Sequence, residues 1–373
     1  MEGCPIYSTD GGIHRRACRK VSVGHDHRKP VEIGGDAPVS VQSMIKRKPD
    51  EVASIIDDIL ILEDAGCELI RLTVPDEDAA AKLPEILKEI HIPLIADIHF
   101  NPRAAIASVK AGGDKIRLNP GNIARESDIT EIARICMDYG VPIRVGVNSG
   151  SIPKDLLEKH KGNRVTASVE CAFRHVEILR NVGLEDIVVA IKSSHTDEMI
   201  RSNRLLAEKC DLPIHLGVTE AGLAWEGSIR SAVGIGTLLA EGIGDTIRVS
   251  LTDKPVEEIK TGFEILMSLG LREQGITFVS CPTCGRSEAD IRPIVTALKE
   301  RLGHLDKPLR VAIMGCPVNG PGEAAGSDIA LMGGKDMGVI YIGEAVLKTV
   351  AESEWIDEME RQIKRLFDEK YGI

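Results

Sequence analysis

An eightfold alternation of strand-like and helix-like segments is the feature that most limits what this chain can fold into. Each short apolar segment ends in polar residues, and a helix-like stretch of roughly 15–30 residues follows it. In Asp50–Gly66, for example, apolar residues recur at helical spacing and a glycine ends the run. The strand-like segments are Ala37–Met44, Cys67–Val74, Pro93–Phe100, Asp114–Gly121, Pro142–Gly150, Asp186–Ser194, Pro213–Gly222 and Asp245–Thr252. Eight such units predict a parallel (β/α)8 barrel of the TIM type, with an open doubly wound sheet as the alternative.

The alternation stops after the helix-like segment Pro255–Gly270. Beyond it we expect a strand at 276–280, a helix within 287–303, strands at 309–314, 328–332 and 338–343, and then helices to the end. Ser287 is expected to cap the helix, with Asp290 in its first turn. The sequence therefore predicts a barrel over residues 1–268 and a separate α/β domain over residues 269–373.

Composition narrows the class of protein. The 373 residues carry a net charge of -11 and contain nine cysteines. The acidic balance argues against nucleic-acid binding. We expect a cytoplasmic protein, because no apolar run is long enough to span a membrane and the N-terminus lacks a signal-peptide pattern. In that compartment the cysteines are expected to be thiols or metal ligands rather than disulfides.

Cationic side chains stand at the ends of the predicted barrel strands, where barrel enzymes place their active sites. Arginine pairs well with phosphate oxygens, so their convergence predicts a site for a small multiply charged anion, most simply a diphosphate. The alternative is that they lie deeper in the barrel and pair with acidic neighbours. These cations are Arg71, Arg117, Arg144, Lys192 and Arg248.

Other polar residues share these strand ends. Glu220 either neutralises the cations or serves as the proton donor or acceptor of the site. Asp97 and His99 are expected to orient the arginines. Asn148 and Ser250 also lie on these strands.

The second domain carries a candidate metal centre. Cys281 and Cys284 form a CxxC motif, and Cys316 follows 32 residues later. The CxxC spacing alone fits zinc ribbons, redox dithiols and iron–sulfur sites. Glu323 is a candidate fourth ligand, because three thiolates and one carboxylate suit a cluster with one exchangeable iron. It is otherwise a surface carboxylate, with water as the fourth ligand or none.

The whole series of motifs resembles the bacterial 4-hydroxy-3-methylbut-2-enyl diphosphate synthases of the methylerythritol phosphate pathway to isoprenoids. The resemblance covers nearly the whole chain, in order, and corresponds to the short two-domain form of that family. The motifs that carry it are PVSVQSM, GCELIRLTVPD, IADIHF, KIRLNPGNI, IRVGVNSGS, IKSSHT, HLGVTEAG, GIGDTIRVSL, CPTCGR and VNGPGEA.

The resemblance implies a reaction and its residues. The substrate would be 2-C-methyl-D-erythritol 2,4-cyclodiphosphate, reduced by two electrons with ring opening and loss of water. A [4Fe–4S] cluster would be held by Cys281, Cys284, Cys316 and Glu323. Glu220 would be the acid/base residue. The diphosphate and substrate contacts would be Arg71, Arg117, Arg144, Asn148, Lys192, Arg248, Ser250 and Asn319.

The resemblance also implies partners. A flavodoxin or ferredoxin would supply electrons. A head-to-tail homodimer would build each active site from the barrel of one chain and the cluster domain of the other.

Two segments depart from the family pattern. Residues 45–50 read IKRKPD where the family usually has a turn rich in hydroxyl and amide side chains, and Pro317 replaces an aliphatic residue. Two other functions are weighed against this one: a zinc-dependent or pteridine-type barrel enzyme with a structural cysteine domain, and an electron-transfer protein fused to a phosphate-binding barrel.

Overall fold

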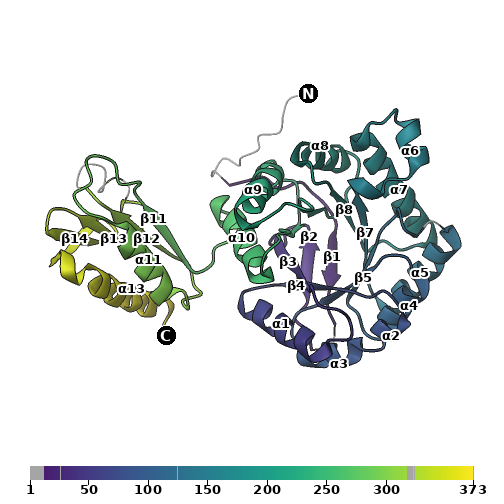
Figure 1. The fold of residues 1–373 in the computed structure, drawn as a ribbon, viewed down its shortest axis with the longest axis horizontal. Helices are drawn as coiled ribbons and strands as arrows, with labels where there is room; N and C mark the ends of the chain where they lie inside the picture. Colours follow the sequence, from purple (N-terminus) through teal and green to yellow (C-terminus); the bar gives the residue numbers. More distant parts are fainter. Residues whose placement is uncertain (1–11, 26, 124, 317–321, 323, 373) are drawn as a thin grey trace. The chain divides into compact units, whose positions relative to one another are not determined.

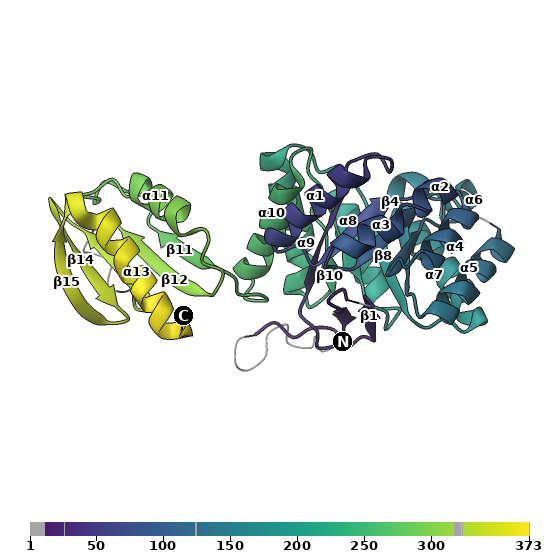
Figure 2. The same cartoon turned by 90° about the horizontal axis from the view of Figure 1, so that it is seen from below.

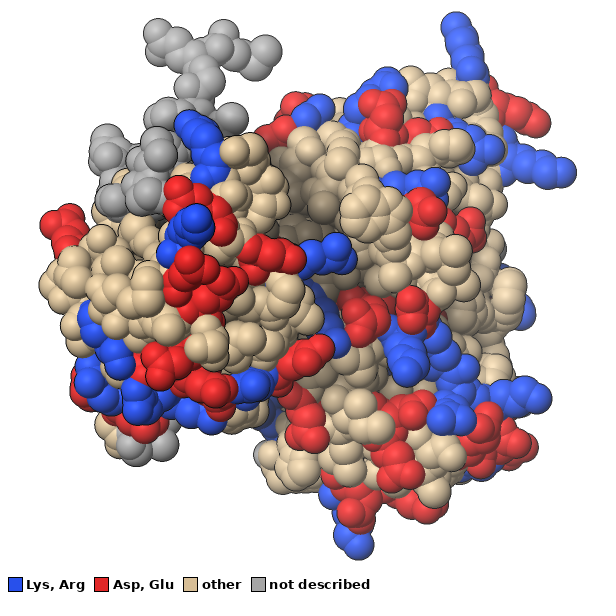
Figure 3. Space-filling model, turned by 60° about the vertical axis from the view of Figure 1, so that its left-hand side comes forward, with Lys and Arg blue, Asp and Glu red and all other residues tan. Residues whose placement is uncertain are grey.

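The computed structural model describes residues 12–372 except 26, 124, 317–321 and 323. The chain forms two compact units, Met1–Arg272 and Glu273–Ile373. Among the described residues, no helix is both long and apolar enough to cross a membrane. On the face shown in Figure 3, acidic and basic side chains are interspersed and no broad basic patch is visible.

The first unit is a parallel eight-stranded barrel, as predicted (Figure 1). The strands are β3 (Ser40–Met44), β4 (Leu69–Thr73), β5 (Leu94–Ile98), β6 (Lys115–Leu118), β7 (Ile143–Asn148), β8 (Ile187–Lys192), β9 (His215–Leu216) and β10 (Thr246–Ile247). The sheet runs in the order β8-β7-β6-β5-β4-β3-β10-β9. A parallel bridge between Val189 and Ile214 joins its two edges, which distinguishes the barrel from an open sheet. β9 and β10 are much shorter than the segments that predict them.

Helices form a ring outside the strands (Figures 1 and 2). Local signals set their ends: the side chain of Asn163 caps the start of α7, and Gly183 ends it in a left-handed conformation with φ of 99°. The helices are α1 (Val52–Asp64), α2 (Glu77–Ala80), α3 (Leu83–Glu89), α4 (Pro102–Lys110), α5 (Glu126–Tyr139), α6 (Lys154–Lys159), α7 (Arg164–Val182), α8 (Thr196–Ala207), α9 (Ala224–Ala240) and α10 (Pro255–Ser268).

Alternation along the strands separates two buried regions. In β6, Ile116 and Leu118 belong to the apolar core between the barrel and its helices. Because successive strand residues point to opposite faces, Lys115 and Arg117 point into the barrel. The same alternation sends Arg71, Asp97 and the other polar strand residues inward, so the interior of this barrel is largely polar.

An antiparallel hairpin that the sequence analysis did not predict closes the N-terminal end of the barrel (Figures 1 and 2). It consists of β1 (Lys20–Val23) and β2 (Val31–Gly34). Its apolar face contributes Val21, Val23 and Ile33 to a cluster with Leu69, Ile95 and Val188, which lie at the starts of β4, β5 and β8. This cluster, which we call the floor, seals the barrel opposite the end where active sites lie.

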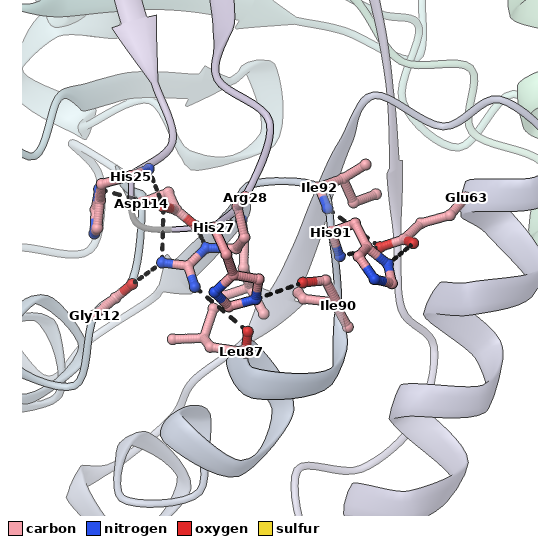
Figure 4. A network of polar contacts seen from close by, with 11 residues as sticks. His25, His27, Arg28, Glu63, Leu87, Ile90, His91, Ile92, Gly112 and Asp114 are labelled. Carbon is pink, nitrogen blue, oxygen red and sulfur yellow. Dashed lines mark hydrogen bonds and ion pairs between the residues drawn. The ribbon is translucent and has the colours of Figure 1, made fainter.

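A buried ion pair fixes the hairpin loop to the barrel (Figure 4). Arg28 donates from Nε to Oδ2 of Asp114 at 2.9 Å and from Nη2 to Oδ1 at 3.1 Å. Asp114 also accepts hydrogen bonds from the backbone N–H groups of His25 and Leu94. The carboxylate thus joins the hairpin, β5 and the start of β6.

The segment before the hairpin pairs with residues far along the chain. Arg15 lies 2.7 Å from Asp245, just before β10. Arg19 pairs with Asp211 and Glu185, just before β9 and β8. These contacts tie the segment before the hairpin to the last strands of the barrel.

The second unit is a five-stranded sheet in the order β11-β12-β13-β14-β15, with the first three strands parallel and the others antiparallel. Helices α11 (Arg292–Leu302) and α13 (Trp355–Tyr371) pack on one face. The strands are β11 (Ile276–Ser280), β12 (Leu309–Met314), β13 (Ile329–Gly333), β14 (Met337–Ile342) and β15 (Ala345–Ala351).

Two local predictions for this unit are wrong. Residues 345–351 form a strand, where only helices were expected after residue 343. Gly343 (φ 54°) allows a tight turn, after which this strand, β15, pairs antiparallel with β14. Ser287 does not cap α11, which begins at Arg292. The Ser287 hydroxyl instead donates to the carbonyl of Ala289 at 2.8 Å.

Candidate active site

The barrel carries a cavity of about 120 Å³ at the carboxyl ends of its strands. We call it the mouth. The five cations predicted there all line it, and they come from β4, β6, β7, β8 and the residue after β10. Asn148 and Ser250 line it as well. Neighbouring strands therefore bring together side chains that lie far apart in the sequence.

Asp97 binds two of these cations. Its Oδ1 accepts a hydrogen bond from Nη1 of Arg117 at 3.1 Å, and its Oδ2 lies 3.7 Å from Nε of Arg71. His99 lies 3.7 Å from the same Oδ2. Burial opposes ionisation of Asp97, but Arg71 and Arg117 outweigh it and lower its pKa to about 2. The expectation that Asp97 orients the arginines has this geometry as its support.

The other cations have weaker partners. Arg144 donates from Nη1 to the side-chain oxygen of Gln42 at 3.1 Å. Arg248 lies 3.5 Å from Glu258 of α10. For Lys192 the described residues offer no hydrogen-bond acceptor or carboxylate at contact distance. The five cations thus share two carboxylates, so pairing with acidic neighbours accounts for only part of their charge.

Crowding of these cations has an electrostatic cost. Burial, and then the charges of Arg248 and Arg117, lower the pKa of Arg71 to about 9 despite Asp97. Burial and the neighbouring arginines also hold the pKa of Lys192 well below its usual value. A multiply charged anion in the mouth would relieve this repulsion.

The unusual loop Ile45–Asp50 directs its first two cations to structural partners. Lys46 lies 3.2 Å from Glu258, and it donates to the carbonyl of Leu251 at 2.9 Å. Arg47 pairs with Asp58 of α1 at 2.8 Å. The loop therefore supports the carboxylate behind Arg248, and the described contacts give it no place in the mouth.

Glu220 lies beside the mouth rather than in it. It lines a neighbouring cavity of about 350 Å³, which shares Asn148 and Thr219 with the mouth. Its side chain is exposed, and its backbone has a φ of 53°, which is unusual for a residue with a side chain. Strained backbone of this kind concentrates at functional sites.

Sequence reasoning missed several residues of this second cavity, among them Arg164 and His195. His195 lies three residues after the end of β8, so its position near a strand end was an available signal. Arg164 begins α7, well beyond the end of β7, and the sequence gives no signal that it returns to the site.

The three predicted thiols lie in the second unit, at the carboxyl ends of two adjacent strands. Cys281 and Cys284 follow β11, and Cys316 follows β12, which pairs with β11 in parallel. The backbone N–H of Gly315 points at Sγ of Cys281 at 3.4 Å. Hydrogen bonds from the backbone and guanidinium of Arg286 lower the pKa of the Cys284 thiol. Cys284 and Cys316 in turn raise the pKa of Arg286, so this guanidinium is within electrostatic reach of both cysteines.

Cysteine thiolates are the usual ligands of iron–sulfur clusters, but these three side chains are not close enough together to share one metal ion. Within the described part of the chain, no three His, Cys, Asp or Glu side chains are close enough together to hold a metal ion. The predicted ligand Glu323 and the predicted substrate contact Asn319 lie outside the described residues.

Comparison with known proteins gives one consistent result. Residues 18–263 match the GcpE TIM-barrel domain, and residues 277–365 match the GcpE protein C-terminal domain. A protein of Symbiobacterium thermophilum named 4-hydroxy-3-methylbut-2-en-1-yl diphosphate synthase (flavodoxin) is 49% identical over 93% of this chain and 92% of its own. A protein of the same name from Clostridium perfringens is 46% identical over 95% of this chain and 100% of its own. A dihydropteroate synthase structure from Stenotrophomonas maltophilia has a TM-score of 0.46 and 16% identity, covers 62% of this chain and 93% of its own, and supports no functional comparison.

Proposed function

Since the chain belongs to the GcpE family of 4-hydroxy-3-methylbut-2-en-1-yl diphosphate synthases (flavodoxin), which are oxidoreductases, we propose that it catalyses their reaction in isoprenoid biosynthesis. The substrate is 2-C-methyl-D-erythritol 2,4-cyclodiphosphate. Two electrons and two protons enter, the ring opens, one water leaves, and the product is the linear allylic diphosphate.

The observation that carries the proposal is the mouth. Among the residues that the structure describes, its five cations share only the carboxylates of Asp97 and Glu258. A diphosphate supplies the missing negative charge, and arginine forks bind its oxygens in pairs. Arg71, Arg117, Arg144, Lys192 and Arg248 hold it, and Asn148 and Ser250 orient it.

The second unit is proposed to hold a [4Fe–4S] cluster through Cys281, Cys284, Cys316 and Glu323. When bound, this cluster supplies the electrons one at a time. The adjacent strand ends and the thiolate-favouring Arg286 support three of these ligands.

Glu220 is proposed to hold the proton that leaves with the departing hydroxyl group. Its cavity joins the mouth at Asn148 and Thr219, so a ligand whose diphosphate lies among the arginines can extend its carbon chain toward this carboxylate. Asn319 is proposed to contact the same substrate.

Three further parts of the proposal concern organisation. Residues 1–268 bind the substrate and residues 269–373 bind the cluster. The electron donor is a flavodoxin, as in the names of the relatives, or a ferredoxin. The enzyme works in the cytoplasm as a head-to-tail homodimer, so that each substrate meets the cluster of the partner chain.

An anaerobic preparation tests the proposal. We expect sulfur-to-iron absorbance, about four irons and four sulfides per chain, and ring opening of the cyclodiphosphate with reductant. Cys281→Ser is expected to lose the iron, and Cys210→Ser, in the barrel unit, to keep it. A colourless protein with stoichiometric zinc, or a cluster-loaded protein that leaves the cyclodiphosphate intact, would overturn the proposal.

A further inference from the structure

A second polar layer lies inside the barrel, between the floor and the mouth. Lys115 is the first residue of β6 and pairs in register with Ile95, which belongs to the floor. Its side chain points inward by the alternation described above and is 0% exposed. A lysine is therefore enclosed directly beneath the cations of the mouth.

The polar atoms of this layer lack partners. Nζ of Lys115 makes no hydrogen bond to any described residue, and neither ring nitrogen of His215 makes one. The same holds for the hydroxyls of Ser40 and Thr246, which pair in register with each other on β3 and β10. Buried polar groups are almost always hydrogen-bonded, so this cluster calls for an explanation.

The charged surroundings of Lys115 are one-sided. Arg144 of β7 acts on it, and Lys115 in turn acts on His215 of β9. The residue paired with it on β5 is the apolar Ile95. Burial, and then the charge of Arg144, hold the pKa of Lys115 well below its usual value. Burial and the nearby cations likewise hold the pKa of His215 well below its usual value. A proton on Lys115 is thus opposed first by burial and then by the charge of Arg144.

A bound diphosphate would oppose the electrostatic effect of Arg144 on Lys115. Its negative charges would lie above Arg144 and offset the repulsion between this guanidinium and a proton on the buried amine. On the basis of the proposed function, we propose that Lys115 is a positioning residue of the diphosphate site, uncharged in the free protein and protonated from solvent when the diphosphate binds. The ammonium then lies beneath Arg144 and holds positive charge below the ligand.

Calorimetry on the full-chain protein, purified anaerobically, tests the proton uptake. The ligand is ethyl diphosphate at pH 8.5, where the phosphate oxygens are fully ionised, so any proton taken up goes to the protein. Titrations in two buffers of different ionisation enthalpy measure that uptake. We expect Lys115→Met to take up about one proton fewer per ligand than the unmodified chain. Lys110→Met, a matched change at an exposed position at the end of α4, should take up as many protons as the unmodified chain.

Two further measurements separate a positioning role from a structural one. Lys115→Met replaces a buried amine without a partner by an apolar side chain of similar length, so its thermal stability should be equal or higher. Its affinity for ethyl diphosphate should be roughly tenfold weaker at pH 7. The rise in affinity at lower pH, expected for the unmodified chain, should disappear.

The other possible results contradict either the role of Lys115 or the diphosphate site itself. Binding without proton uptake, or full uptake by Lys115→Met, overturns the inference, because the proton then goes elsewhere, for instance to Lys192 or His215. A Lys115→Met chain that fails to fold also overturns it, because the amine would then have a structural role. Failure of the unmodified chain to bind ethyl diphosphate would instead count against the diphosphate site of the proposed function.

Discussion

The ion pair between Arg28 and Asp114 allows a quantitative test of how the hairpin is held. Asp114→Asn keeps the shape of the side chain but removes the charge that faces the Arg28 guanidinium. Both side chains are almost completely buried, at 2% and 0% exposure. Removing one partner of a buried ion pair costs about 3–5 kcal/mol. The backbone N–H groups of His25 and Leu94 would also lose their charged acceptor, but Arg28 keeps the carbonyls of Leu87 and Gly112 as acceptors, so we expect the lower part of this range.

Denaturant unfolding of the purified protein measures this loss as a change in the free energy of unfolding. Asp64→Asn, at an exposed position at the end of α1, is the control, with an expected change within about 0.5 kcal/mol. Affinity for ethyl diphosphate should stay unchanged in both variants, because the pair lies at the end of the barrel opposite the mouth. A loss below about 1 kcal/mol for Asp114→Asn would refute the view that this pair fixes the hairpin. So would an equal loss in the control.

Three further predictions concern the site. Arg248→Ala should raise KM for the cyclodiphosphate roughly tenfold, equivalent to about 1.4 kcal/mol. Arg201→Ala, on the exposed face of α8, is the control and should leave KM unchanged. An unchanged KM in Arg248→Ala would argue against the mouth as the diphosphate site. Glu323→Ala should retain iron and sulfide but lower turnover, and full turnover would exclude this residue as a ligand. Asp97→Asn should lower the free energy of unfolding at pH 7 by about 2 kcal/mol, the value of a pKa lowered from 3.8 to about 2. Because a lowered carboxyl pKa stabilises the folded state above the unfolded pKa, the loss of stability between pH 4 and 2 should be shallower in this variant; an identical acid limb would refute the assignment.

The alternation of strands and helices was predictable because it depends on local patterns. Apolar segments that end in polar residues identified all eight barrel strands and placed the five cations at one end. The hairpin was missed because β1 and β2 are only four residues each and pack on the barrel rather than in its sheet. β15 was missed because most of its side chains are exposed or half-buried, so its apolar pattern is weak.

The height of a side chain along the barrel axis was harder to predict than whether that side chain points into the barrel. The alternation along β6 shows that Lys115 and Arg117 point inward. Only the register with neighbouring strands shows that Lys115 lies next to the floor and Arg117 at the mouth. Partners such as Glu258 and Gln42 were missed for the same reason, since they approach the cations from α10 and β3. For the thiols, the sequence predicted a metal centre formed by Cys281, Cys284 and Cys316 in the second domain, but only the structure shows that β11 and β12, which precede them, are adjacent. The assignment of Glu323 depends on resemblance to the family.

The long-range contacts of Arg15 and Arg19 also have a consequence for the order in which the chain can fold during synthesis. Arg15 leaves the ribosome about 230 residues before its partner Asp245. The hairpin can dock on the first strands early, but the pairs with Glu185, Asp211 and Asp245 form only when the last strands emerge. The segment that contains Arg15 and Arg19 is therefore synthesised before the barrel strands and is among the last parts of the barrel to be fixed. A nascent chain that stalls before residue 245 would keep this segment accessible to chaperones and proteases.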